Sequence, residues 1–234
     1  MRHSLKLCSF IFTMIAIANA CYSQDQKSAI LSDQSTVTYV VNDQKQLEGP
    51  FSIYRTKDEV FLRGSYRNNM RSGNWYAFNQ EGKVFMRYNY DLKKVLFIDT
   101  VSINRLNVQV ATKDSQIREK ASIPFPVCSI DQYISLLGTE LKRLILQENK
   151  GADGNLNVEL VADVSKDGKA NYYGLYNANG VNSKKRLILP DNNFKIDWIP
   201  ASYNGEKYAA TFSVKASIDF RSGIPGRQRF LWVY

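Results

Sequence analysis

Residues 49–72 read GPFSIYRTKDEVFLRGSYRNNMRS and residues 73–96 read GNWYAFNQEGKVFMRYNYDLKKVL, so the two stretches align at a period of 24. Five aligned positions are identical, and other matching positions keep aromatic or aliphatic character. In each unit a short β-compatible segment, 51–54 or 75–78, is followed by turn residues and then by a second apolar segment. The duplication predicts two consecutive β-hairpins.

A single hairpin cannot bury its own apolar face, whereas stacked hairpins share a continuous core. The block from 47 to 99 is therefore predicted to be a small array of β-hairpins, with a degraded third unit at its end. Residues typical of turns stand within and between the units: Lys57-Asp58, 80–82, Asn68-Asn69 and Ser72-Gly73.

This block resembles the bacterial variant of the MORN-repeat family, whose units follow the pattern Gly-x-aromatic-x-x-aromatic. The pattern is met by Gly49, Phe51 and Tyr54, and again by Gly73, Trp75 and Phe78. The family's second glycine is Gly64 in the first unit, while Tyr88 replaces it in the next. The resemblance implies packing and binding rather than catalysis. Five aromatic residues either form a ligand platform or fill the core: Tyr54, Tyr66, Trp75, Tyr76 and Tyr90.

The C-terminal part, 128–234, has the pattern of an α+β unit. Ser129 and Gln132 have the spacing of a capping box, and apolar residues on one helical face predict a helix that ends near residue 149. Apolar and polar residues alternate over 156–164, and a Lys-Asp-Gly turn follows. The strand expected at 169–176 would return antiparallel, so a hairpin is predicted. Residues 183–189 are expected to form a short helix, and 208–220 a long strand with one polar face. The predicted fold class is mainly β with an α+β C-terminal part.

Residues 129–220 resemble a degenerate C-terminal domain of the TonB energy-transducer family. The matching residues are Trp198, Pro200, Ala201 and Gly205, followed by the end of the last strand at Ile218-Asp219-Phe220. The family implies an antiparallel sheet packed on a helix, and an exposed sheet edge that binds an extended peptide of an envelope protein. We expect the motif residues to pack the core and set a turn.

The edge that this resemblance suggests is the last strand, 207–220. Its candidate partner-binding residues are Lys207, Ala209, Thr211, Ser213 and Lys215. On the polar face, Thr211 and Lys215 would meet an acidic, extended partner.

The N-terminus predicts export. Arg2 and Lys6 precede the apolar stretch 7–18, which is shorter than the roughly 20 residues of a spanning helix, so 1–23 is predicted to be a secretory signal peptide. Cleavage before Cys21, cleavage before Gln24 and lipidation of Cys21 all remain open. We expect a periplasmic or outer-membrane-associated protein with a polar segment at 24–46, and residues 100–127 as a connecting hairpin.

Composition excludes several kinds of chemistry. The single histidine, His3, lies in the predicted signal peptide, which argues against Ser-His-Asp and Cys-His catalysis and against histidine metal ligands. Cys128 is expected to be a small core residue. The formal net charge of +9 fits a solvated basic surface, because the charges form no long run. The other interpretation is an acidic protein or an anionic envelope surface as partner, because an exported protein does not normally meet nucleic acid.

These observations predict a non-catalytic envelope binding protein without cofactor or metal. One alternative is a TonB-like energy transducer that retains its N-terminus as a membrane anchor. The other is a hydrolase using two carboxylates, although no spacing selects a pair. The acids available to it are Asp153, Asp163, Asp167, Asp191 and Asp197.

Overall fold

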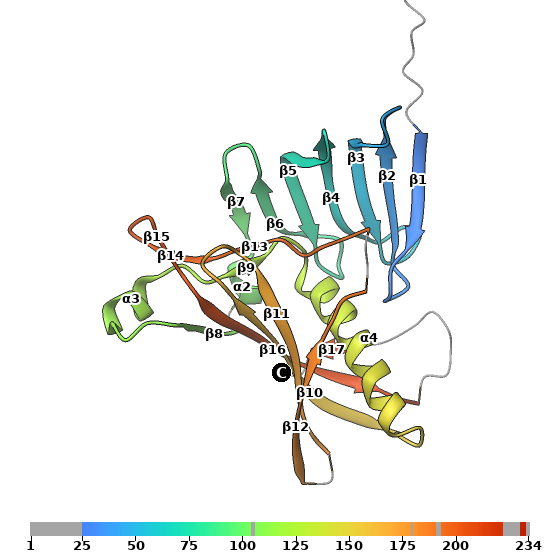
Figure 1. Ribbon diagram of the computed structural model, residues 1–234, viewed down its shortest axis with the longest axis vertical. Helices are drawn as coiled ribbons and strands as arrows, with labels where there is room; N and C mark the ends of the chain where they lie inside the picture. The colour runs from blue at the N-terminus through green and yellow to red at the C-terminus, as the bar shows by residue number, and fades with distance from the viewer. Residues whose placement is uncertain (1–24, 104–105, 179, 191–192, 222–229, 233–234) are drawn as a thin grey trace, which may run out of the picture.

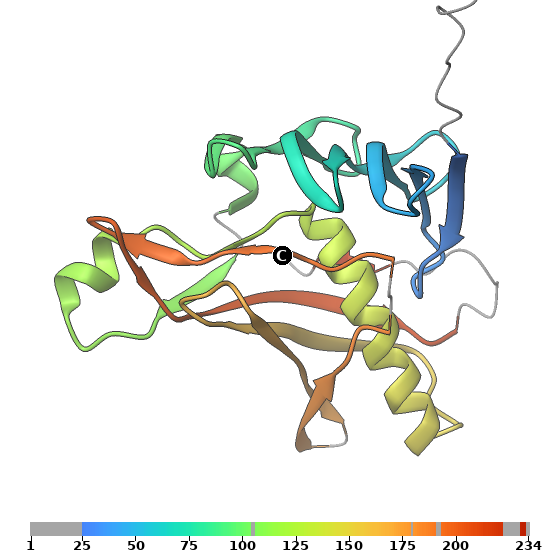
Figure 2. The same ribbon diagram turned by 45° about the horizontal axis from the view of Figure 1, so that its top comes forward.

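The computed structural model describes residues 25–103, 106–178, 180–190, 193–221 and 230–232, and all statements below refer to these. The predicted signal peptide, Cys21 and Asp191 lie outside them. The fold is mainly β with a small helical part, as the sequence predicts. A seven-stranded sheet and a second sheet lie on different sides of the long helix α4 (Ile130–Glu148), as Figures 1 and 2 show.

The N-terminal sheet is an antiparallel meander in which each strand pairs with the next along the chain. Its strands are β1 (Asp25–Ile30), β2 (Thr36–Val41), β3 (Leu47–Tyr54), β4 (Val60–Arg67), β5 (Met70–Phe78), β6 (Val84–Asn89) and β7 (Lys94–Ile98). The segment 24–46, described above only as polar, therefore contributes two strands. Five of the six residues of β1 are exposed, so the strand has no apolar pattern that would predict it.

The duplicated sequence folds into duplicated hairpins. Residues Asn68 and Asn69, with φ of 50° and 64°, form the two-residue turn between β4 and β5. The register skips Phe61 between β3 and β4, and it skips the equivalent Phe85 between β5 and β6. Both units thus carry the same bulge. Ser72-Gly73, predicted as a turn, lies within β5.

The connecting segment 100–127 is not the predicted hairpin. It contains two short helices, α2 (Thr100–Ile103) and α3 (Ser115–Lys120), and two short strands, β8 (Asn107–Val110) and β9 (Phe125–Pro126). β8 pairs with β16 (Ala210–Asp219), and β9 pairs with β13 (Trp198–Ile199). The β-compatible residues of this segment pair with distant strands instead of with each other, which local pattern cannot reveal.

The helix α4 begins and ends where the sequence predicts. Ser129 is its N-cap and accepts a hydrogen bond from the backbone N–H of Gln132 at 3.1 Å. Only this half of the predicted capping box forms, because the side-chain amide of Gln132 is buried without a hydrogen-bond partner. The apolar face of the helix packs on the C-terminal sheet, where Gly174 lies directly beneath Leu141.

The C-terminal sheet has the order β12-β11-β10-β16-β17, with β8 also paired to β16. Its remaining strands are β10 (Asn155–Val164), β11 (Ala170–Ala178), β12 (Val181–Leu187) and β17 (Phe230–Trp232). The hairpin β10–β11 is confirmed, with Gly168 at φ 75° in its turn. The short helix predicted at 183–189 is wrong, since these residues belong largely to β12. A two-stranded hairpin of β14 (Ala201–Tyr203) and β15 (Glu206–Tyr208) precedes β16.

The last long strand is central and not the predicted edge. Along one side β16 pairs with β10 over its whole length, and along the other side it pairs with β8 from Ala210 to Ser213 and with β17 from Ala216 to Ile218. Alternating apolar and polar residues predict a strand with one polar face. In a sheet that packs on the core with only one face, edge and interior strands both show this alternation, so it does not identify the edge. The partners β8 and β17 have only four and three residues, too short for a recognisable pattern.

Candidate functional site

One edge of the C-terminal sheet is β12, which pairs with β11 and with no other strand that the structure describes. It is longer than β8 and β17, the short strands at the opposite edge. Ala178 and Val181 flank a two-residue connection and form the hydrogen-bonded pair that closes this hairpin. Hydrogen-bonded and non-hydrogen-bonded pairs alternate along an antiparallel ladder. The N–H and C=O groups of Asn182, Lys184 and Arg186 therefore point away from β11, along the open side of the sheet.

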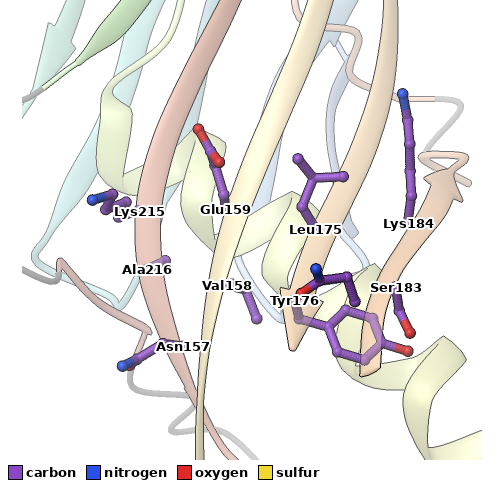
Figure 3. Close-up of a pocket in the computed structure, with 10 residues that line it drawn as sticks. Asn157, Val158, Glu159, Leu175, Tyr176, Ser183, Lys184, Lys215 and Ala216 are labelled. Carbon is purple, nitrogen blue, oxygen red and sulfur yellow. The ribbon is translucent and has the colours of Figure 1, made fainter. Parts of the chain in front are cut away.

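A groove of ≈ 630 Å³ borders this edge on the sheet face opposite α4. The strand register places Lys215, Glu159, Leu175 and Lys184 in one row across β16, β10, β11 and β12. Figure 3 shows the side chains of Glu159, Leu175 and Lys184 on one side of the sheet, with Val158 pointing to the other side. The whole lining is Asn157, Val158, Glu159, Leu175, Tyr176, Asn182, Ser183, Lys184, Lys215 and Ala216.

Most charges near the groove are already committed to protein contacts. Glu159 accepts a hydrogen bond of 2.5 Å from the hydroxyl of Ser213, and the ammonium of Lys184 lies 4.1 Å from the ring centroid of Tyr173. On the helix side of β12, Lys185 pairs with Glu148 at 2.6 Å. Lys215 and Arg186 are exposed, and neither side chain makes a hydrogen bond or ion pair within the described chain. The edge is therefore basic, with two cations available to a ligand.

The five predicted partner-binding residues do not form a common edge. Lys207 lies in β15 opposite Ser202, and the carbonyl of Ala209 accepts a hydrogen bond of 2.9 Å from the backbone N–H of Ala111, which directly follows β8. The hydroxyl of Thr211 donates to Asp163 at 2.9 Å, and Ser213 is buried. Of the five, Lys215 alone lines the groove.

The four motif residues lie in structural positions. Trp198 is buried, contacts Tyr133 and Phe212 edge-to-face, and donates from Nε1 to the hydroxyl of Tyr172 at 2.9 Å. A side chain at Gly168 would meet the carbonyl oxygen of Trp198. The β10–β11 turn therefore packs tightly against the backbone of this motif residue.

The rest of the motif shapes the neighbouring hairpin. Pro200 follows β13 and lies beside the β10–β11 turn. Ala201 is fully buried against Val110 and Ala210. Gly205, with φ 81°, forms the turn between β14 and β15.

The predicted aromatic platform is divided between two faces. Tyr66, Trp75 and Tyr90 lie on the inner face of the seven-stranded sheet, where they surround the guanidinium of Arg71. Arg71 also donates to the carbonyl oxygen of Lys195, and it was not singled out in the sequence. The register places Tyr54 and Tyr76 on the opposite face. The inner aromatics thus pack around Arg71, which connects the repeat sheet to the segment that leads into β13, and they are not free to bind a ligand.

Cys128 and two of the predicted acids are engaged in contacts within the protein. Cys128 is fully buried, and burial raises the pKa of its thiol far above the ordinary value. Asp163 accepts from Thr211, and Asp197 accepts from the hydroxyl of Tyr90 at 2.7 Å. Among the described residues, no three His, Cys, Asp or Glu side chains are grouped so that they could hold a metal ion. In the same part of the chain, none of the helices combines the length and apolarity required to cross a membrane.

Comparison with family models, curated proteins and solved structures finds no match for this chain.

Proposed function

We propose that the protein is an exported, non-catalytic binding protein of the bacterial cell envelope, which captures an extended acidic segment of a partner protein by strand addition to β12. The observation that carries this proposal is the open side of β12, where no strand of the described chain pairs with the main-chain groups of Asn182, Lys184 and Arg186, next to a groove. An added strand would satisfy these groups with a regular ladder of hydrogen bonds.

The charge of the edge supports an acidic partner. Lys184, Lys185 and Arg186 are consecutive in β12, and Lys215 faces the same groove from β16. Lysine on an edge strand discourages pairing with other strands in general, which protects against aggregation. Here the same charges would select a strand that carries carboxylates and reject a neutral or basic one.

The two family resemblances support the class of function. A MORN-like hairpin array and a TonB-like sheet packed on a helix would both be binding modules, and the signal-like N-terminus would place them in the envelope. The proposed docking mode is the one that the TonB resemblance implies, but the strand that offers the edge is β12 in place of the last strand. Strand addition to β16 is excluded over the residues that β8 and β17 already pair.

The experiment uses a labelled peptide in which glutamate and valine alternate, with fluorescence anisotropy as the readout. Lys184→Pro removes an N–H that points away from β11, so the β11–β12 ladder keeps its bonds. We expect Lys184→Pro to weaken peptide binding about tenfold or more. This is the effect of losing one or two hydrogen bonds between β12 and the bound peptide. Lys184→Ala keeps the N–H and removes the charge, so its loss of affinity should be smaller.

Two results would overturn the proposal. One is equal affinity of wild type and Lys184→Pro for the acidic peptide, with circular dichroism confirming that the variant is folded. The other is equal affinity of the wild type for the acidic peptide and for its lysine-valine counterpart.

A further inference from the structure

The seven-stranded sheet has an outer face, on the side away from α4. Figure 2 shows α4 and the C-terminal sheet on the other side. The register pairs Arg63 with Tyr76, Tyr76 with Arg87, and Arg87 with Phe97. These four residues, from β4, β5, β6 and β7, form a row that we term the outer row. Cations and aromatic rings alternate along it.

The two arginines of the outer row are not used by the fold. Neither Arg63 nor Arg87 makes a side-chain hydrogen bond or an ion pair with another described residue, and Nε of Arg87 is shielded without a partner. Arg71 provides the contrast, because it donates hydrogen bonds to two tyrosine hydroxyls and to one main-chain carbonyl. At the end of the row, Phe97 is 46% exposed.

The duplication gives an independent reason to assign the arginines a role. Arg63 and Arg87 are equivalent positions of the two units, and they belong to the five identities between them. Other identities have structural explanations: Phe61 and Phe85 are buried at the equivalent bulges, and the glycines that open the units have positive φ. The arginine is repeated although its side chain makes no hydrogen bond or ion pair with another described residue in either unit.

We propose that the outer row binds an anionic glycan chain. Adjacent strands are about 4.8 Å apart, so the backbones of Arg63 and Arg87 lie roughly 10 Å from each other, with Tyr76 on the strand between them. Guanidinium groups bind carboxylate or phosphate through two parallel hydrogen bonds, and aromatic rings offer flat apolar faces on which sugar rings can stack. A linear glycan with repeated acidic groups matches a straight row of alternating cations and rings.

The ligand class proposed for the outer row follows from the positive charge of the row and from the predicted export of the protein. The four residues of the outer row include no carboxylate. Asp58, Glu59 and Glu81 line a hollow beside Arg63, and two of them are paired with cations, Glu59 with Arg55 and Glu81 with Lys83. Single-stranded nucleic acid would also match cations interleaved with rings. The predicted export of the protein places it among envelope glycans, and nucleic acid is therefore the competing outcome that the experiment must separate. The proposal does not depend on strand addition at β12, which lies in the other sheet.

The test is affinity electrophoresis of the full mature protein in gels that contain polygalacturonate, with dextran as the uncharged glycan. Polygalacturonate should retard the wild type and dextran should not, and added salt should weaken the retardation. The variant Arg63→Gln should reduce the affinity about tenfold, and Arg63→Gln with Arg87→Gln should reduce it further. Arg63 is exposed, so the single variant remains informative if the double variant is unstable.

The matched control is Lys57→Gln with Lys207→Gln, which removes the same charge from exposed positions away from the outer row. The proposal is supported if this control keeps the affinity of the wild type. Equal losses in the control and in the arginine variants would overturn it, because retardation would then reflect net charge. Binding of oligothymidylate that is stronger than binding of polygalacturonate and equally sensitive to Arg63→Gln would also overturn it, in favour of nucleic acid.

Discussion

The guanidinium of Arg71 in β5 donates a hydrogen bond of 2.6 Å from Nη2 to the carbonyl oxygen of Lys195, which lies 124 positions further along the chain. The same group lies 4.5 Å from the ring centroid of Trp75, and its side chain is 7% exposed. One buried cation therefore joins the repeat sheet to the segment that leads into β13. The aromatic residues of the repeats line its pocket, which explains why they are not available to a ligand.

Removal of this cation should destabilise the whole protein. Arg71→Ala deletes hydrogen bonds to Lys195, Tyr66 and Tyr90 together with a cation–π contact, so we expect the free energy of unfolding to fall by about 3 kcal/mol. Urea denaturation followed by tryptophan fluorescence measures this change. Arg67→Ala, an exposed neighbour on β4, should change it by less than about 0.5 kcal/mol. Equal effects of the two substitutions would contradict the assigned role of Arg71.

The protein should lose stability in alkali because of its buried tyrosines. Burial raises the pKa of Tyr90, Tyr133 and Tyr172 far above the ordinary value of about 10. Above that pH the unfolded chain releases protons that the folded protein retains, so the free energy of unfolding falls, by up to about 1.4 kcal/mol per pH unit for each group. Below about pH 9 these tyrosines contribute no slope.

Tyr133→Phe tests this explanation. The variant loses a hydrogen bond of 3.3 Å to the carbonyl oxygen of Leu160, which costs about 1 kcal/mol at neutral pH. Its stability should then decline less steeply between pH 10 and pH 11 than that of the wild type. Urea denaturation at a series of pH values gives both quantities, and parallel alkaline slopes would contradict the prediction.

Gly64 should not tolerate a side chain. A Cβ atom there would meet the ring of Trp75, with Cδ2 only 2.2 Å away. Because Trp75 is fully buried and cannot move aside, we expect Gly64→Ala to cost about 2–3 kcal/mol. Gly151→Ala is the control, since its nearest neighbour would be at 3.6 Å and its backbone is outside the left-handed region. A thermal midpoint for Gly64→Ala equal to that of the control would refute this packing.

Cys128 should be unreactive in the folded protein. Its side chain is fully buried, and burial raises the pKa of the thiol, so little thiolate exists at neutral pH. Maleimide labelling, with the modified residue located by mass spectrometry, should reach Cys128 only after denaturant is added. Rapid labelling of Cys128 in the native protein would indicate that the core around the start of α4 opens.

Local sequence signals predicted the hairpins and the long helix. Asn68-Asn69 and Lys166-Asp167-Gly168 form turns that a few adjacent residues of the right type predict. The helix from Ile130 is predicted by its N-cap residue and by the helical spacing of its apolar residues. The strands β1 and β12 were missed because edge strands expose most of their residues and lack an apolar face. For β12 the pair Asn179-Gly180 was the available signal, since Asn-Gly favours a two-residue hairpin.

The candidate site could not be predicted because strand order depends on distant partners. Thr211 and Ser213 alternate as edge residues would, yet β8 pairs with the same part of β16 from a segment about 100 positions earlier in the chain. Conversely, Lys184 lies on an open edge only because no described strand pairs beyond β12. Only Lys215 of the predicted set lines the groove, because the register places it opposite Glu159 and in one row with Leu175 and Lys184.

Residue-by-residue amide hydrogen exchange, with and without the glutamate-valine peptide, tests strand addition to β12 most directly. If a strand adds to β12, the amides of Asn182, Lys184 and Arg186 gain protection when the peptide binds. Those of Ser183 and Lys185, already bonded to β11, should change little. Binding of the peptide without added protection at the three outward amides, or with protection confined to another strand, would rule out strand addition at β12.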